Sequence, residues 1–182
     1  MLLGLGLACL AAGAAAEEYP LVERGRAVSQ IVLDREQLEA TAAYAALELA
    51  DYLEKATGAR VPVRLDAAPG VYPVYLLLRG SRAATLPEAA AAAANRVRDD
   101  GFLLAADRSG VYVVAARERG VLYGAYEILK RYGGVRWLMP GPEGEVCPKR
   151  PIVSVPAQVT LANPSMRLRR FNLVCGGARD DT

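Results

Sequence analysis

The sequence predicts one domain of the α/β class, and three observations lead to this prediction. A chain of 182 residues, of which 53% are hydrophobic, can bury the core of one globular domain of ordinary size. Short runs rich in Val, Ile and Leu alternate with two long stretches in which apolar residues recur every three or four positions. Segments rich in Gly, Pro and Asp separate these runs, as they separate strands and helices in compact domains.

The first segment has the composition of an export signal. Residues 2–16 are almost wholly Leu, Gly and Ala, and this stretch is too short to cross a bilayer as a helix. Small residues at positions 14–16 precede Glu17 and suit cleavage by signal peptidase. We therefore expect residues 1–16 to be a signal peptide and the mature chain to be secreted or periplasmic. A trimmed core helix is the alternative interpretation of the same stretch.

A strand followed by a long helix is expected next. Residues 27–33 are rich in Val and Ile and alternate loosely, which favours a strand. Asp34 and Gln37 have the spacing of a capping box at the start of a helix. Apolar residues then recur at helical spacing and form one stripe, and Gly58 is placed to end the helix. The stripe comprises Leu38, Ala42, Ala45, Leu49, either Tyr52 or Leu53, and Ala56.

The central part of the chain predicts further strands. Residues 61–65 form a short strand that Pro62 restricts to a sheet edge, and residues 74–79 form a strand buried on both faces. The six alanines at 89–94 favour a variable surface helix or loop, because they offer nothing large to pack. Residues 102–106 and 111–115 flank a turn-forming segment and predict an antiparallel hairpin.

A second long helix is expected from about Arg119 to the glycine pair at 133–134. Gly120 and Gly124 lie one turn apart on it and favour close packing of the helix backbone. A phosphate-binding loop is the alternative, but the third glycine of a dinucleotide fingerprint and the Lys of a P-loop are missing. A short strand at 135–138, a turn-rich loop at 140–144, a strand at 152–155 and a linker at 156–164 complete the order.

Composition limits the possible chemistry. A net charge of +2 gives no electrostatic footprint for nucleic acid, and no segment is long and apolar enough to span a membrane. The chain has no histidine, which excludes Ser-His-Asp and Cys-His relays and the usual His-bearing zinc sites within it. The carboxylates that could form an acid–base pair are better interpreted as surface charges: Glu118, Glu127, Glu143 and Glu145. We therefore expect no catalytic residue, no metal site and no cofactor.

A few residues are candidates for ligand binding or cross-linking. Trp137 is the only tryptophan, and with Arg136 beside it the indole could stack on a sugar; anchoring of a core edge is the alternative. The tyrosines of the second helix spread around it and suit packing and rim positions rather than a binding platform. Cys147 and Cys175 could form a disulfide in an oxidising compartment or remain two buried thiols.

Several motifs together resemble a known family. They are GVLYGAYEIL at 120–129, GVRWLMPG at 134–141 and GEVCP at 144–148, preceded by ALELADYLEKATG at 46–58 and DGF at 100–102. In their order and spacing, over about residues 27–170, they resemble the N-terminal domain of α-glucuronidase-like glycoside hydrolases. Similar domains precede the barrel in β-hexosaminidases and in large secreted bacterial proteins of unassigned function.

The resemblance implies both a fold and a division of the chain. The fold is a two-layer α/β sandwich, a mixed β-sheet with the two long helices on one face, placed ahead of a catalytic (β/α)₈ barrel and carrying no catalytic residue. Residues 17–156 would form this accessory domain, and residues 157–182 the linker and the start of a truncated barrel. Arg169 matches an arginine that binds sugar in hexosaminidase relatives, although Arg170 stands where the family usually has glycine.

Two functional hypotheses follow. The first is a non-catalytic N-terminal accessory domain of an exported carbohydrate-active enzyme, whose polysaccharide or oligosaccharide substrate is bound by a barrel outside this sequence. The second is a stand-alone extracytoplasmic module that binds a carbohydrate around Arg136 and Trp137 or acts as a scaffold. A nucleotide-binding domain would depend on Gly120 and Gly124 alone.

Overall fold

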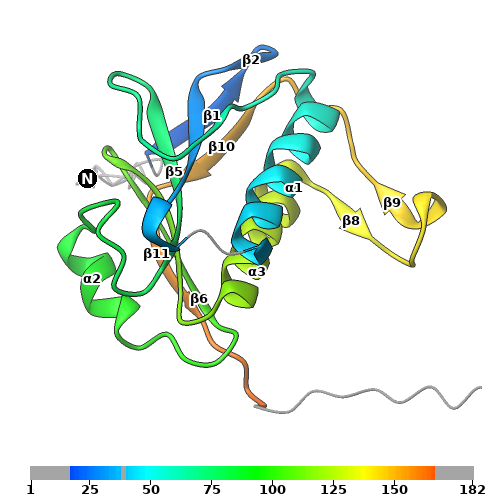
Figure 1. The fold of residues 1–182 in the computed structure, drawn as a ribbon. Helices are drawn as coiled ribbons and strands as arrows, with labels where there is room; N and C mark the ends of the chain where they lie inside the picture. The colour runs from blue at the N-terminus through cyan, green and yellow to red at the C-terminus, as the bar shows by residue number, and fades with distance from the viewer. Residues whose placement is uncertain (1–16, 38–39, 167–182) are drawn as a thin grey trace, which may run out of the picture.

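A mixed six-stranded sheet forms the centre of the molecule (Figure 1). The computed structural model describes residues 17–37 and 40–166. The order of the strands across the sheet is β11 (Gln158–Ala162), β6 (Phe102–Asp107), β7 (Gly110–Ala115), β5 (Tyr72–Leu78), β3 (Ser29–Leu33) and β4 (Val63–Arg64). Strands β7, β5, β3 and β4 run parallel, and β6 is antiparallel to both of its neighbours. The predicted hairpin and the edge position of the strand near Pro62 are confirmed.

Two long helices, α1 (Ala40–Thr57) and α3 (Glu118–Ile128), lie side by side on one face of this sheet (Figure 1). Their apolar stripes meet the side chains that alternate strand residues direct to this face, such as Val74, Leu76 and Val113. The predicted two-layer α/β arrangement is therefore confirmed. The capping signal at Asp34 acts on a short 3₁₀ turn, Arg35–Gln37, where its Oδ1 accepts the Glu36 amide at 2.9 Å.

Glycines on α3 let the helix backbone approach the sheet. A Cβ atom at Gly124 would overlap Cγ1 of Val113, and one at Gly120 would overlap the carbonyl oxygen of Gly101. Both positions are buried. The packing interpretation of the two glycines is thus confirmed, since each faces protein atoms at a distance that leaves no room for a ligand phosphate.

The opposite face of the sheet is covered by the short helix α2 (Glu88–Ala94). Ala90, Ala93 and Ala94 are buried there, whereas Ala91 is exposed. The alanine run thus forms a helix, one of the two expected alternatives, and the large side chains at this contact come from the sheet. They are Leu77, Leu103, Tyr112 and Val114.

A second, three-stranded sheet has the order β10 (Val153–Pro156), β1 (Glu18–Glu23) and β2 (Arg26–Ala27). Strand β1 was not among the predicted elements. The linker expected at 156–164 is also wrong over residues 158–162, since these form β11 and pair with β6 along its length. Prolines at 156 and 164 flank this segment and suggested a linker, but the strand pairs with residues more than fifty positions earlier, which local patterns do not reveal.

The chain after α3 forms a projecting ribbon. A π-helical turn, Leu129–Gly133, ends at Gly134 with φ of 75°, as the predicted glycine stop requires. Strands β8 (Arg136–Trp137) and β9 (Glu145–Val146) then pair antiparallel around a 3₁₀ turn, Pro142–Gly144. Figure 1 shows this β8–β9 ribbon extending away from the helices on the side opposite the sheet.

Candidate functional site

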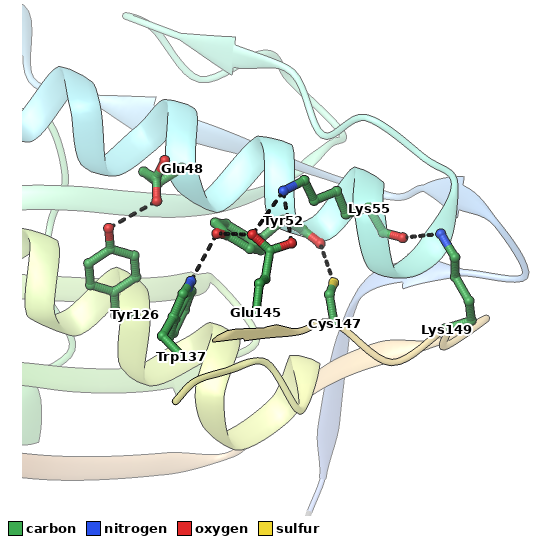
Figure 2. A network of polar contacts seen from close by, with 8 residues as sticks. All are labelled: Glu48, Tyr52, Lys55, Tyr126, Trp137, Glu145, Cys147 and Lys149. Carbon is green, nitrogen blue, oxygen red and sulfur yellow. Dashed lines mark hydrogen bonds and ion pairs between the residues drawn. The ribbon is translucent and has the colours of Figure 1, made fainter. Parts of the chain in front are cut away.

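Trp137 stands at the centre of a polar and aromatic network that joins the β8–β9 ribbon to the helices (Figure 2). Its Nε1 donates a hydrogen bond to the Tyr52 hydroxyl at 2.9 Å. The indole also meets Tyr52 and Tyr126 edge-on, with ring centroids 5.1 and 4.9 Å apart. These contacts fix the plane of the indole, and 40% of the residue stays exposed.

Glu145 links the ribbon to α1 through two donors. Its carboxylate accepts hydrogen bonds from the Tyr52 hydroxyl at 2.7 Å and from Lys55 Nζ at 2.9 Å. The bond to Glu145 raises the pKa of Lys55, and the bonds from Lys55 and Tyr52 lower the pKa of Glu145. Both side chains therefore stay charged around neutral pH. Burial raises the pKa of Tyr52, and the hydrogen bond from Trp137 acts in the opposite direction. The Tyr52 hydroxyl therefore keeps its proton and donates it to Glu145 in a hydrogen bond.

Tyr126 extends the network along α3. Its hydroxyl donates a hydrogen bond to Glu48 at 2.9 Å, and burial together with this carboxylate raises the pKa of Tyr126. Cys147 follows β9, and its thiol lies 4.0 Å from the carbonyl oxygen of Tyr52. The ribbon is thus held on α1 by the hydrogen bonds of Trp137 and Glu145, and on α3 by the contact between Trp137 and Tyr126.

A groove of about 410 Å³ opens beside Trp137. The groove lies between α3, the ribbon and residues 162–164, which are close to the last described residue, Met166. Aromatic rings form much of its wall, and a few polar side chains stand around it. The lining residues are Asp100, Phe102, Tyr123, Tyr126, Glu127, Lys130, Trp137, Ala162, Asn163 and Pro164.

Most polar side chains around this groove already bind other protein groups. Asn163 accepts the Arg98 amide with Oδ1 and donates from Nδ2 to the Arg96 carbonyl, both at 3.0 Å. Asp100 lies 3.3 Å from the Arg119 guanidinium. Glu127 pairs with both Lys130 and Arg131. The groove therefore presents aromatic surface with few polar groups left for a hydrophilic ligand.

Residues 19–128 match a family model described as "Glycosyl hydrolase family 67 N-terminus". The chain belongs to this family. The resemblance drawn from the sequence motifs is thereby confirmed. A comparison with curated proteins finds no match.

Solved structures share the fold of this family 67 N-terminal domain. A GH20 β-N-acetylhexosaminidase from Streptomyces coelicolor A3(2) aligns over 83% of this chain and 24% of its own, with 21% identity and a TM-score of 0.52. A Streptomyces plicatus β-hexosaminidase gives the same coverage and TM-score at 22% identity. A family GH115 4-O-methyl-α-glucuronidase aligns over 82% of this chain and 19% of its own, with 13% identity and a TM-score of 0.53. The chain thus spans about a quarter of the hexosaminidase chains or less.

The predicted sugar-contacting residues of the family 67 N-terminal domain are not brought together. Trp137 lines the groove. The guanidinium of Arg136 instead donates hydrogen bonds to the backbone carbonyls of Lys130 and Val135, at 2.6 and 2.8 Å. It therefore binds the π-helical turn that follows α3. Arg169 and Cys175 lie outside the described residues, so the sugar contact of Arg169 and the Cys147–Cys175 disulfide stay predictions.

The glutamates interpreted as surface charges have structural partners. Glu118 accepts the Thr41 amide at 3.2 Å, Glu127 forms two ion pairs on its own helix, and Glu145 binds Lys55 and Tyr52. Over residues 17–37 and 40–166, no group of three or more Asp, Glu, Cys or His side chains is placed to hold a metal ion. No helix in the same part of the chain is long and apolar enough to cross a membrane.

Sequence reasoning missed the partners that hold Trp137. Tyr52 belongs to the predicted helix stripe of α1, and 85 positions separate it from Trp137. Tyr126 was expected to be a packing or rim residue, and its edge-on contact with Trp137 fits that expectation. Tyr123, with 38% of the residue exposed, stands on the rim of the groove.

Proposed function

We propose that this chain is the non-catalytic N-terminal accessory domain of an exported carbohydrate-active enzyme, an α-glucuronidase-like glycoside hydrolase. The observation that carries the proposal is the match of residues 19–128 to a family 67 N-terminus. The carboxylates of the described residues agree with it, because the glutamates nearest the groove serve in ion pairs and hydrogen bonds within the fold. The acid and base of hydrolysis would lie in a (β/α)₈ barrel encoded beyond residue 182.

Activity measurements on two lengths of chain test this proposal. The 182-residue chain is expected to hydrolyse neither aryl glycosides nor glucuronoxylan fragments above background, whereas the longer natural polypeptide hydrolyses at least one of them. Hydrolysis by the 182-residue chain, abolished by Glu127→Ala or Glu145→Ala, would overturn the proposal. So would a natural stop codon directly after Thr182.

Arg169 is the residue of this chain proposed to reach the substrate in the longer enzyme. Arg169→Ala is expected there to raise KM or to lower kcat. Glu127→Ala, a matched removal of a charge on α3, is expected to leave both constants unchanged in enzyme that remains folded.

Export is the second part of the proposal, and the composition of residues 2–16 supports it. Cell fractionation followed by N-terminal sequencing is the direct test. The extracytoplasmic protein is expected to begin at Glu17, and cytoplasmic protein that retains residues 1–16 would contradict this part.

A stand-alone carbohydrate-binding module is the second candidate, and the exposed indole of Trp137 is the observation that favours it. Calorimetric titration of the 182-residue chain with xylan fragments and uronic acids separates the two candidates. Micromolar binding that is lost in Trp137→Ala, in protein that still unfolds cooperatively, would favour the module.

A further inference from the structure

The carboxyl ends of the parallel strands meet at a point where the chain leaves the sheet in opposite directions. After β3 the chain crosses to the face covered by α1. After β4 and β5 it crosses to the other face, where Gln30 binds the segment after β4 and the segment after β5 leads to α2. In open α/β sheets such a topological switch point opens a crevice outside the strand ends, and ligands of these folds bind in it.

A crevice of about 290 Å³ lies at this switch point. Its walls are residues 34–36, 65–67 and 82–83, which belong to the segments that follow β3, β4 and β5, and Val32 lies at its floor. We call it the switch-point crevice. It shares no lining residue with the groove beside Trp137. The volume is small for a drug-sized ligand, and it suits a ligand of about the size of one sugar ring.

A side chain fixes each wall of the switch-point crevice. Asp34 Oδ1 accepts the Glu36 amide at 2.9 Å. The fully buried Gln30 makes three hydrogen bonds, each of 2.9 Å, to the backbone of residues 68–71, which continue the wall after β4. In the wall after β5, the Ser81 hydroxyl accepts a backbone amide two residues later at 3.1 Å. The crevice is therefore preorganised, which lowers the entropic cost of binding.

Carboxylates and guanidiniums alternate around the opening of the crevice. Arg35, after β3, forms an ion pair with Asp66, after β4. Glu36 and Arg82 are exposed on the walls after β3 and β5, and within the described residues neither side chain forms an ion pair. A carboxylate accepts hydrogen bonds and a guanidinium donates them, so both side chains can bind a polar ligand.

The chemistry of these groups favours a neutral sugar. Each sugar hydroxyl both donates and accepts a hydrogen bond, which matches a wall of carboxylates facing guanidiniums. The carboxylates of residues 34, 36 and 66 outnumber the guanidiniums of residues 35 and 82, and this formal charge of about −1 repels phosphates and other anions. Val32 and Leu65 supply the apolar surface that the C–H groups of a sugar ring can contact.

We propose that the switch-point crevice binds one residue of a neutral carbohydrate, with Glu36 and Arg82 as hydrogen-bonding partners. This site goes beyond the proposed function, which gives the folded domain no sugar site of its own. It is also distinct from the groove beside Trp137, which would serve the stand-alone module.

Amide chemical shifts of the 182-residue chain test the proposal, because they report both the affinity and the position of binding. The probes are D-glucose, D-galactose, D-xylose and N-acetyl-D-glucosamine, each titrated separately to about 50 mM, with inorganic phosphate as the anionic probe. We expect at least one sugar to shift the amides of residues 34–36, 65–67 and 82–83 with a Kd in the millimolar range. Phosphate should shift none of them.

Two single variants remove the proposed contacts. Glu36→Ala and Arg82→Ala are each expected to weaken sugar binding about 10-fold or more, because each removes a hydrogen bond of a charged group. Both side chains are exposed and outside ion pairs, so the fold should remain intact, and circular dichroism checks it. Arg26→Ala is the matched control, since Arg26 is an exposed arginine on β2 that does not line the crevice. It should leave the Kd unchanged.

The possible results separate the crevice from other sites. Absence of shifts with all four sugars would overturn the proposal, and so would a Kd that neither Glu36→Ala nor Arg82→Ala changes, or one that Arg26→Ala weakens equally. Shifts centred on Trp137 and lost in Trp137→Ala would assign the sugar to the groove and overturn the crevice. Shifts with phosphate alone would overturn the assignment to a neutral sugar. Hydrolysis by the longer polypeptide tests the accessory-domain proposal separately, so the failure of one proposal is distinguishable from the failure of the other.

Discussion

The two faces of the six-stranded sheet achieve close packing with different small residues, glycines on α3 and alanines on α2. Beneath α3, the helix contributes glycines and the sheet contributes Val113, which occupies the space that a helix side chain would need. Beneath α2, the helix contributes alanines and the sheet contributes larger groups such as Leu103 and Tyr112. At these contacts the bulk comes from the sheet, whereas elsewhere on their face α1 and α3 bury large side chains such as Leu49 and Ile128. The side-chain volume that a helix position can hold therefore depends on the side chain that faces it from the sheet, and cannot be judged from the helix sequence alone.

The faces differ in what lies outside the helices. Figure 1 shows the ribbon and the end of the described chain on the side of α1 and α3, while α2 covers the other face by itself. The aromatic groove is lined by α3, the ribbon and residues 162–164, so changes beneath α3 threaten both stability and the candidate site. Changes beneath α2 should affect stability alone.

The largest effect is expected at Gly124, on the α3 face. In Gly124→Leu the side chain would collide with Val113 in a fully buried contact, so we expect a loss of at least about 3 kcal/mol in unfolding free energy. Urea denaturation followed by circular dichroism measures this loss. Gly133→Ala is the matched control, since its nearest neighbour would be 3.6 Å away, and it should change stability little. A loss for Gly124→Leu as small as that expected for Gly133→Ala would show that α3 approaches β7 less closely than described.

A smaller effect is expected beneath α2. Ala90 is fully buried and Ala91, its neighbour on the same short helix, is exposed. Ala90→Leu should destabilise the domain by about 1–3 kcal/mol through overpacking, and Ala91→Leu by less than about 0.5 kcal/mol. Thermal unfolding of both proteins at one pH makes the comparison. An Ala90→Leu protein as stable as the Ala91→Leu protein would mean that α2 lies on the sheet without close packing.

Local patterns predicted the elements whose partners are near in sequence. The strand at 29–33 with helix α1, the hairpin of β6 and β7, and α3 with its packing glycines follow from spacing and turn chemistry alone. Strands β1 and β11 were missed because each is defined by pairing with a distant segment. In particular, β11 pairs with β6, and the prolines around it suggested a linker.

The candidate site was only partly readable from the sequence. Trp137 stands out because it is the sole tryptophan, but its hydrogen bond to Tyr52 and its contact with Tyr126 join three elements that no local spacing relates. Arg136 was paired with Trp137 because they are neighbours in sequence. On a strand, adjacent side chains point in opposite directions, and Arg136 binds carbonyls at the end of α3 instead.

On the outer surface of the helical face, Tyr126→Phe should have a moderate effect. It removes the hydroxyl that donates to Glu48 and leaves the ring that contacts Trp137. We expect a loss of about 1 kcal/mol in unfolding free energy, the usual net value of a part-buried hydrogen bond. Denaturant unfolding measures the loss, and Tyr123→Phe, on the same helix with 38% of Tyr123 exposed, is the control. An equal loss in both proteins would assign the effect to the helix rather than to the bond with Glu48.

The smallest effect is expected at the ion pair that holds the ribbon. Glu145→Gln keeps an acceptor for the Tyr52 hydroxyl and removes the charge opposite Lys55, whose side chain is 53% exposed. Because solvent screens such a pair, the loss of unfolding free energy at neutral pH should be below about 1 kcal/mol. Glu145→Asp keeps the charge but shortens the side chain. This matched variant separates the effect of losing the charge from the effect of losing the hydrogen-bond geometry.

The dependence on pH tests whether charge is the cause of this small loss. The pKa of Glu145 is lowered in the folded protein, so its contribution is present above the unfolded carboxyl value of about 4.3 and is lost as the pH falls through the folded value. The pKa of Lys55 is raised, so its contribution is present below the unfolded value of about 10.4 and is lost as the pH rises through the folded one. The difference in Tm between the parent protein and Glu145→Gln should therefore be constant from about pH 6 to 9 and shrink at both extremes. A difference that persists unchanged well below pH 4 would assign the effect to packing of the ribbon instead of to the ion pair.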